Sequence, residues 1–176
     1  MTGDLEPIPA VVMIMGPVEG FPPPLQTKPA RIIQKDLKFH PSLLVIPVDT
    51  KVDFPNEDFE FHNVFSYSKT KRFDLGRYHK GESKSVRFTN PGIGMIYCEI
   101  HQWMRVAVVV VENPFYAETD ENGHFEINNI PKGTYKVLIW KVDHKKSVKE
   151  VTVKDSGTAE LTVTLPEKKS DRFKTE

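Results

Sequence analysis

Four residues of types that bind metal ions stand at two places in the chain. Cys98, His101 and Met104 follow one another at intervals of three residues, directly after a β-like run at residues 94–97. His62 stands well upstream, at the start of another such run. Three ligands at this interval fit into one tight loop around a single ion. A histidine from a neighbouring strand would complete the site.

These four side chains form a soft ligand set. Two histidines and a cysteine in one plane, with a weak axial methionine, is the arrangement of a blue-copper electron-transfer site. Each residue alone has a plainer interpretation: a lone cysteine on a strand is usually an inert core residue, and His62 or Met104 could simply pack. The joint spacing favours the metal site. We therefore predict one copper ion per chain that cycles between Cu(II) and Cu(I).

The rest of the sequence excludes several other kinds of metal site and of catalytic site. Cys98 is the only cysteine in 176 residues. A single chain therefore cannot form a disulfide, a binuclear copper centre bridged by two thiolates or a four-cysteine zinc site. No open carboxylate pair, nucleophile with a base or phosphate-binding loop is recognisable, so we do not expect an enzyme.

The overall composition excludes several classes of partner. Lysine plus arginine and aspartate plus glutamate each number 24, so the chain lacks the basic excess that binding to nucleic acid or to an anionic membrane requires. The longest apolar run, residues 106–111, is far shorter than the ~20 residues of a membrane-spanning helix. A hydrophobic content of 39% is enough for a packed core.

Short β-like runs between turn residues must position the candidate ligands. These runs are rich in valine, isoleucine and aromatic residues, and no window has a convincing helical period. The expected strands are residues 10–15, 43–48, 51–54, 63–67, 85–88, 94–97, 106–111, 115–119, 124–127, 134–140, 147–153 and 159–165. Residues 74–78, between the two ligand motifs, could cover one side of the site, but we expect them to be a solvated loop. The pattern predicts an all-β fold built from antiparallel sandwiches.

Two sandwich modules fit the strand spacing better than one, because the spacing shortens near residue 113. We expect residues 39–112 to form the metal-binding domain and residues 113–167 a second, smaller antiparallel β-sandwich, followed by a polar tail at residues 168–176. Residues 1–38 contain one strand and a proline-rich linker. We expect this N-terminal segment to belong to the second sandwich.

Residues 39–112 resemble the cupredoxin family. The resemblance lies in residues 56–64, which include His62, and in residues 97–101, which include Cys98 and His101. The spacing to Met104 has the short length of amicyanin, whereas plastocyanin-like loops place methionine two residues later, where this chain has Val106. Phe61 stands where many cupredoxins have proline. The resemblance implies a Greek-key β-sandwich with one type 1 copper, which carries single electrons between redox partner proteins.

The resemblance also implies a role for each site residue. His62, Cys98 and His101 would bind copper closely, and Met104 would be a long axial ligand that tunes the reduction potential. Asn63 would pin the ligand loop by hydrogen bonds near the Cys98 sulfur. Trp103 would either pack under the loop or form an apolar rim where redox partners dock.

The other four histidines have no companions at ligand spacing. We expect all of them to be surface residues: His40, His79, His124 and His144.

Residues 119–125 and 130–135 resemble the carboxypeptidase-regulatory-like (transthyretin-like) domains. The resemblance implies an accessory or adhesive sandwich without catalysis. Asp120 and Glu121 suggest calcium, but a single acidic turn is weak support for a calcium site. Residues 10–15 resemble the first strand of such a module, so the cupredoxin would be inserted within it.

Two other functions use the same sequence features. A copper delivery or storage protein would have the same ligands but would need an exposed, exchangeable metal. A non-redox β-sandwich that binds carbohydrate or protein would have the ligand set by coincidence. The reduction potential, the redox partners, the oligomeric state and the pathway do not follow from the sequence.

The start of the chain bears on the compartment. It lacks a basic region and is not a signal peptide, so the protein is either cytosolic or a mature exported chain. The family resemblance implies a periplasmic or otherwise extracytoplasmic location, with the signal peptide absent from this sequence.

Overall fold

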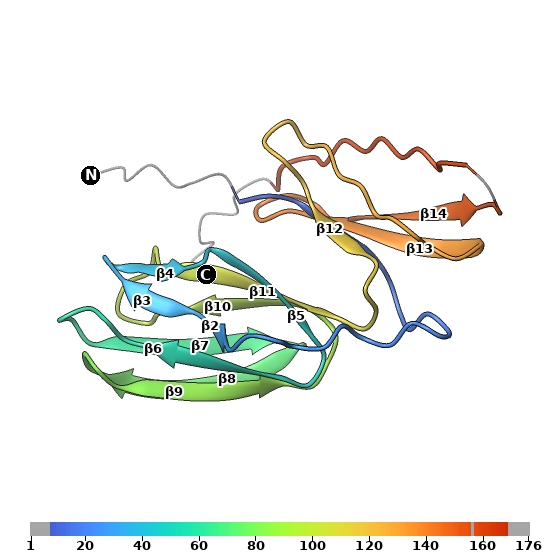
Figure 1. The fold of residues 1–176 in the computed structure, drawn as a ribbon. Helices are drawn as coiled ribbons and strands as arrows, with labels where there is room; N and C mark the ends of the chain where they lie inside the picture. The colour runs from blue at the N-terminus through green and yellow to red at the C-terminus, as the bar shows by residue number, and fades with distance from the viewer. Residues whose placement is uncertain (1–7, 156, 169–176) are drawn as a thin grey trace. The chain divides into compact units, whose positions relative to one another are not determined.

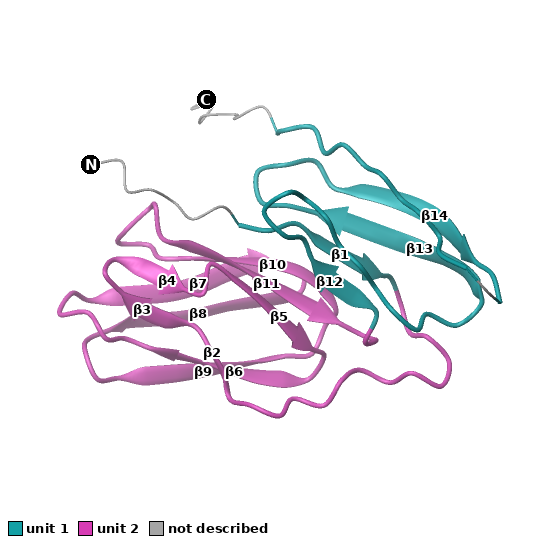
Figure 2. Ribbon diagram, turned by 45° about the horizontal axis from the view of Figure 1, so that its top comes forward, with its two compact units in different colours: residues 1–15, 115–176 teal, residues 16–114 magenta. Residues whose placement is uncertain are grey.

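The structure, a computed structural model, describes residues 8–155 and 157–168. These residues form strands and turns without any helix, as the predicted all-β fold class requires (Figure 1). None of them therefore forms a helix that is long and apolar enough to span a bilayer. The chain divides into two compact units, with residues 1–15 and 115–176 in unit 1 and residues 16–114 in unit 2 (Figure 2).

Unit 2 contains ten strands in three sheets. Its strands are β2 (Ala30–Arg31), β3 (Ile33–Lys35), β4 (Lys38–His40), β5 (Leu43–Pro47), β6 (Thr50–Pro55), β7 (His62–Ser68), β8 (Lys71–Tyr78), β9 (Ser83–Phe88), β10 (Gly92–Tyr97) and β11 (Arg105–Val111). The sheet orders are β5-β11-β10-β7-β8, β2-β6-β9 and β3-β4. The pairs β5–β11 and β2–β6 are parallel, and the remaining pairs are antiparallel.

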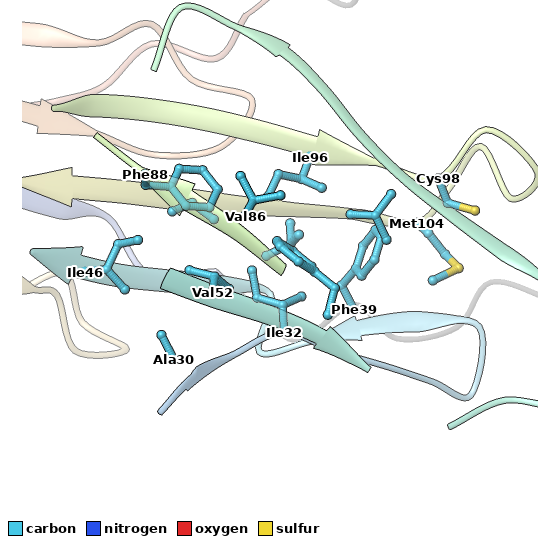
Figure 3. Close-up of a cluster of buried hydrophobic side chains, with 14 of the residues drawn as sticks. Ala30, Ile32, Phe39, Ile46, Val52, Val86, Phe88, Ile96, Cys98 and Met104 are labelled. Carbon is cyan, nitrogen blue, oxygen red and sulfur yellow. The ribbon is translucent and has the colours of Figure 1, made fainter. Parts of the chain in front are cut away.

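One hydrophobic core joins these sheets. It takes side chains from all of them, including Phe39 of β4, Val52 of β6 and Ile96 of β10 (Figure 3). Buried and more exposed residues alternate along β6, as expected for a strand with one face on the core. Strand β11 is instead buried along almost its whole length, in keeping with its central place between β5 and β10.

Unit 1 contains one four-stranded antiparallel sheet within the described residues. Its strands are β1 (Val11–Ile14), β12 (Tyr116–Glu118), β13 (Gly133–Trp140) and β14 (Ser147–Val153), in the order β12-β1-β13-β14. Val12 of β1 lies opposite Ala117 of β12 and Ile139 of β13. The N-terminal strand therefore pairs with C-terminal strands, as expected, and unit 2 lies between β1 and β12 in the chain.

Two expected strands of this unit are not strands. Residues 124–127 and 159–165 have no ladder of hydrogen bonds, although half-buried and exposed residues still alternate along both. Alternation predicts an extended chain with one buried face. It does not supply a neighbour for the backbone N–H and C=O groups, and that neighbour defines a strand.

The structure corrects the sequence interpretation of two segments in unit 2. Residues 74–78 are part of strand β8, and not a solvated loop, because Phe73 and Leu75 pack against the core. Residues 30–40 belong to unit 2, where Ile32 and Phe39 are buried in the core. Unit 2 thus begins well before residue 39. The expected polar tail lies outside the described residues except for Lys168.

The core of unit 2 allows a test of stability. Phe54 is fully buried, so Phe54→Ala is expected to lower the free energy of unfolding by about 3–5 kcal/mol. Phe59→Ala is the matched control, because Phe59 is 86% exposed and its loss should change stability by no more than about 0.5 kcal/mol. Urea unfolding followed by circular dichroism measures both. Equal losses in the two variants would contradict this description of the core.

Candidate metal centre

Three of the four candidate ligands lie together at one end of unit 2. His62 is the first residue of β7, Cys98 directly follows β10, and His101 lies in the loop between β10 and β11. The two Nδ1 atoms of His62 and His101 are 3.0 Å apart, and the Cys98 Sγ atom is 3.8 Å from each of them. Within the described residues, this is the only such group of histidine, cysteine and acidic side chains.

The size of this triangle fits a transition-metal ion. Edges of 3.0, 3.8 and 3.8 Å place an equidistant point about 2.1 Å from all three atoms, close to the usual bond lengths from metal to imidazole nitrogen and thiolate. Both imidazole rings direct the same type of nitrogen toward that point. The three donor atoms could therefore hold one metal ion.

Burial differs among the three ligands. His62 and Cys98 are buried, whereas His101 is partly exposed. Burial and the nearby His62 ring hold the pKa of His101 below its ordinary value. The neutral imidazole, which is the form that binds metal, is thereby favoured.

The ligand loop is closed by short-range hydrogen bonds. The last pair of the β10–β11 ladder, Tyr97 with Arg105, brackets residues 98–104. Inside the bracket, the N–H of Cys98 donates to the carbonyl of Met104 at 3.3 Å. The N–H of Met104 donates to the carbonyl of His101 at 2.9 Å. The spacing predicted from sequence therefore forms a compact loop.

Met104 is buried in the core together with Cys98. Its side chain is 1% exposed, and Figure 3 shows the two sulfur-bearing side chains at the same end of the core. The thioether is thus inside the protein and on the same side of the core as the thiol.

Asn63 connects the ligand loop to two strands. Its buried side chain accepts a hydrogen bond from the N–H of Glu99 at 3.3 Å, next to Cys98. Its Nδ2 donates to Asp74 of β8 at 2.7 Å. These contacts are of the kind expected for a residue that pins the loop.

Trp103 lies on the surface and does not pack under the loop. Its side chain is 62% exposed, and its ring centroid is 5.3 Å from that of His101. Its Nε1 donates to the carbonyl of Leu37 at 3.1 Å, which fixes the indole beside the loop.

Asp58 is a site residue to which sequence reasoning assigned no role. Its Oδ2 lies 2.9 Å from Nε2 of His62, the ring nitrogen that faces away from the cluster. The sequence feature that could have indicated this role is the position of Asp58, four residues before the candidate ligand His62. Burial favours a raised pKa for Asp58, but hydrogen bonds from His62, Leu37 and Asp36 outweigh it and hold that pKa below its ordinary value. Asp58 is therefore the anionic partner of His62.

The remaining histidines are not members of the cluster. His40, His79 and His124 are exposed, as expected, whereas His144 is half-buried with Nδ1 2.8 Å from the carbonyl oxygen of Val142. The Asp120 carboxylate accepts hydrogen bonds from the N–H groups of Asn122 and His124 and so closes its own turn.

Fold and site together define an all-β chain with a buried cysteine and two histidines arranged around one point. Residues 101–172 match a family model described as a CarboxypepD_reg-like domain, a range that begins in the ligand loop and continues through β14. Comparison with curated proteins gives no match.

Several solved structures are similar to part of the chain. A copper-containing nitrite reductase from Thermus scotoductus is 28% identical over 55% of this chain and 25% of its own, with a TM-score of 0.46. A purple cupredoxin from Nitrosopumilus maritimus is 28% identical over 47% of this chain and 99% of its own, with a TM-score of 0.42. An amicyanin variant in the Cu(I) state is 20% identical over 57% of this chain and 98% of its own, with a TM-score of 0.45. The description of the matched family model agrees with the motifs at residues 119–125 and 130–135.

Proposed function

We propose that unit 2 is a mononuclear type 1 copper domain that carries single electrons. Copper would be bound by His62, Cys98 and His101, with Met104 as a long axial ligand. The observation that carries this proposal is the triangle of Sγ and two Nδ1 atoms, whose centre lies at metal-bond distance from all three. Two imidazoles and a thiolate with a weak axial thioether are the donor set of an electron-transfer copper site.

The surroundings of the cluster support electron transfer over delivery or storage of copper. An exchangeable metal needs exposed ligands, but His62 and Cys98 are buried beneath the surface. Hydrogen bonds within the loop, and one from the N–H of Glu99 to the side chain of Asn63, restrain the ligands, so the geometry can stay nearly constant between Cu(II) and Cu(I). Such restraint favours rapid electron exchange.

The partly exposed ligand His101 offers a route for electrons to the surface. Beside it, Trp103 and Ile100 expose apolar side chains, and in this proposal they form the rim where a redox partner protein docks. Unit 1 would be an accessory module without catalysis. The proposal places the protein outside the cytoplasm, in the periplasm or an equivalent compartment, and assigns it no enzymatic turnover.

Titration of the metal-free protein with Cu(II) tests this function. We expect an intense visible thiolate-to-copper absorption that saturates at one copper per chain, and reversible one-electron voltammetry without loss of metal. A colourless complex would contradict the type 1 assignment. Loss of copper on each reduction would favour delivery or storage.

A further inference from the structure

We propose that Asp58 is a positioning residue of the metal site, which orients His62 and stabilises the oxidised state of the bound metal. The inference deepens the proposed function and rests on it for the identity of the metal. Asp58 is not a ligand, because its carboxylate contacts the far side of the His62 ring.

The neighbours of the His62 ring determine which of its two nitrogens carries the proton. Nδ1 faces Cys98 and the Nδ1 atom of His101, so this nitrogen must be free of a proton when metal is bound. The proton then resides on Nε2, and this N–H donates a hydrogen bond to Asp58 Oδ2 at 2.9 Å. Asp58 thereby selects the tautomer that binds metal and fixes the rotation of the ring.

Asp58 is itself held by a turn from another part of the chain. The N–H of Asp36 donates to Oδ1 at 2.7 Å, and the N–H of Leu37 donates to Oδ2 at 3.0 Å. The backbone N–H of Asp58 donates to the side chain of Asn56 at 2.9 Å. The carboxylate therefore has a fixed position before any metal binds.

The turn that holds Asp58 has an uncommon backbone. Asp36 and Leu37 connect β3 to β4, with Lys35 opposite Lys38 in the ladder. Both turn residues have positive φ, 53° and 56°, as a two-residue hairpin turn of the primed type requires. Glycine and asparagine are the usual residues there, and leucine rarely adopts this conformation. The geometry directs two adjacent N–H groups at the carboxylate.

The same turn also reaches the ligand loop. The carbonyl of Leu37 accepts the hydrogen bond from Trp103, which stands between His101 and Met104. One two-residue turn thus contacts both the support of His62 and the loop that carries the other ligands. The β3–β4 turn therefore fixes His62 and the ligand loop relative to each other.

The negative charge of Asp58 has an electronic consequence. A carboxylate that accepts a hydrogen bond from the Nε2–H group raises the basicity of the imidazole, so His62 donates electron density more strongly to the metal. Stronger donation and a nearby negative charge favour the ion of higher charge, Cu(II) over Cu(I). Removal of the charge is therefore expected to raise the reduction potential.

The experiment compares Asp58→Asn and Asp58→Ala with Asp49→Asn. Asp49 is an exposed aspartate of the same unit, paired with Arg87, and it controls for the loss of one negative charge. Zn²⁺ affinity is measured first, because Zn²⁺ has no redox chemistry and accepts the same nitrogen and sulfur donors. Nuclear magnetic resonance of the Zn²⁺-loaded protein reports whether the Nε2 proton of His62 is protected from exchange.

We expect Asp58→Ala to lower Zn²⁺ affinity by 10- to 100-fold, the usual effect of removing such a partner, and to expose the Nε2 proton to exchange. Asp58→Asn retains an acceptor of similar shape, so it should preserve more affinity but still raise the copper potential. Each tenfold loss of Cu(II) affinity relative to Cu(I) affinity raises the reduction potential by about 59 mV for a one-electron couple. Asp49→Asn should change none of these values.

Unchanged Zn²⁺ affinity and an unchanged His62 Nε2 proton in Asp58→Ala would overturn the proposal. If Asp58→Ala does not fold, Asp58→Asn decides, and a potential equal to that of Asp49→Asn would overturn it. A parent protein that binds Zn²⁺ but forms no coloured copper complex would refute the proposed function alone. The Zn²⁺ affinities of the Asp58 variants would still test whether Asp58 positions His62.

Discussion

Replacing Cys98 with serine is expected to abolish the intense visible absorption of the copper-loaded chain. The absorption requires a thiolate bound to Cu(II), and Cys98 is the only cysteine of the chain. A serine hydroxyl stays protonated at neutral pH and is a poor ligand for copper. We therefore also expect the variant to bind copper far more weakly and to lose reversible one-electron voltammetry.

A second variant separates loss of the ligand from loss of the fold. Cys98→Ala removes the sulfur without placing a hydroxyl in a site that is 3% exposed, so it should keep the parent circular dichroism while losing the colour. Titration with Cu(II), monitored by visible absorption, measures both variants. A serine or alanine variant as strongly coloured as the parent would show that Cys98 is not the copper ligand.

The part of the metal centre that sequence predicts best is its local part. Cys98, His101 and Met104 lie within one short loop, so their spacing alone limits where their side chains can meet. His62 is different, because it reaches the cluster only through the pairing of β7 with β10, which sets Phe65 opposite Tyr97. Spacing cannot supply such a long-range pair. The family resemblance indicated it.

The role of Asp58 in supporting His62 could not be predicted from the spacing of residues in the sequence. Asp58 matters because Asp36 and Leu37, more than twenty residues upstream, direct their N–H groups toward it. These contacts depend on the β3–β4 turn, in a segment expected to be linker. Its strands are only three residues each, too short for an alternating pattern to stand out.

Strand β8 was missed for a related reason. Charged residues occupy its outer face, because the exposed Arg72 and Asp74 alternate along the strand with the half-buried Phe73 and Leu75. Together with Gly76, they make the stretch look like a solvated loop. The pairing of Asn63 with Arg77 and of Phe65 with Asp74 shows that it is the edge strand beside β7.

Met104 allows a test in which two substitutions should act in opposite directions. As an axial ligand, a thioether contributes little binding energy beside a thiolate and two imidazoles, so copper should remain bound without it. Met104→Leu leaves the axial position unligated, favours Cu(I), and is expected to raise the reduction potential. Met104→Gln offers a harder oxygen donor, favours Cu(II), and is expected to lower the potential.

If Met104 only packs in the core and does not bind copper, we expect another result. Met104 is fully buried, so as a core residue it should tolerate Met104→Leu at a cost below about 1.5 kcal/mol in unfolding free energy. Met104→Gln would bury an amide and cost more. Neither loss of stability would shift the potential in a consistent direction. Met95→Leu is the control, because Met95 lies in β10 outside the core cluster, and its replacement should leave the potential unchanged.

Voltammetry of the three variants distinguishes the two roles of Met104. Shifts of opposite sign for leucine and glutamine, with no shift for Met95→Leu, require a bond between the axial side chain and copper. Equal potentials for the two Met104 variants would remove Met104 from the metal centre. The triangle of His62, Cys98 and His101 would then be the complete ligand set, because its three donor atoms already surround one point without help from the thioether.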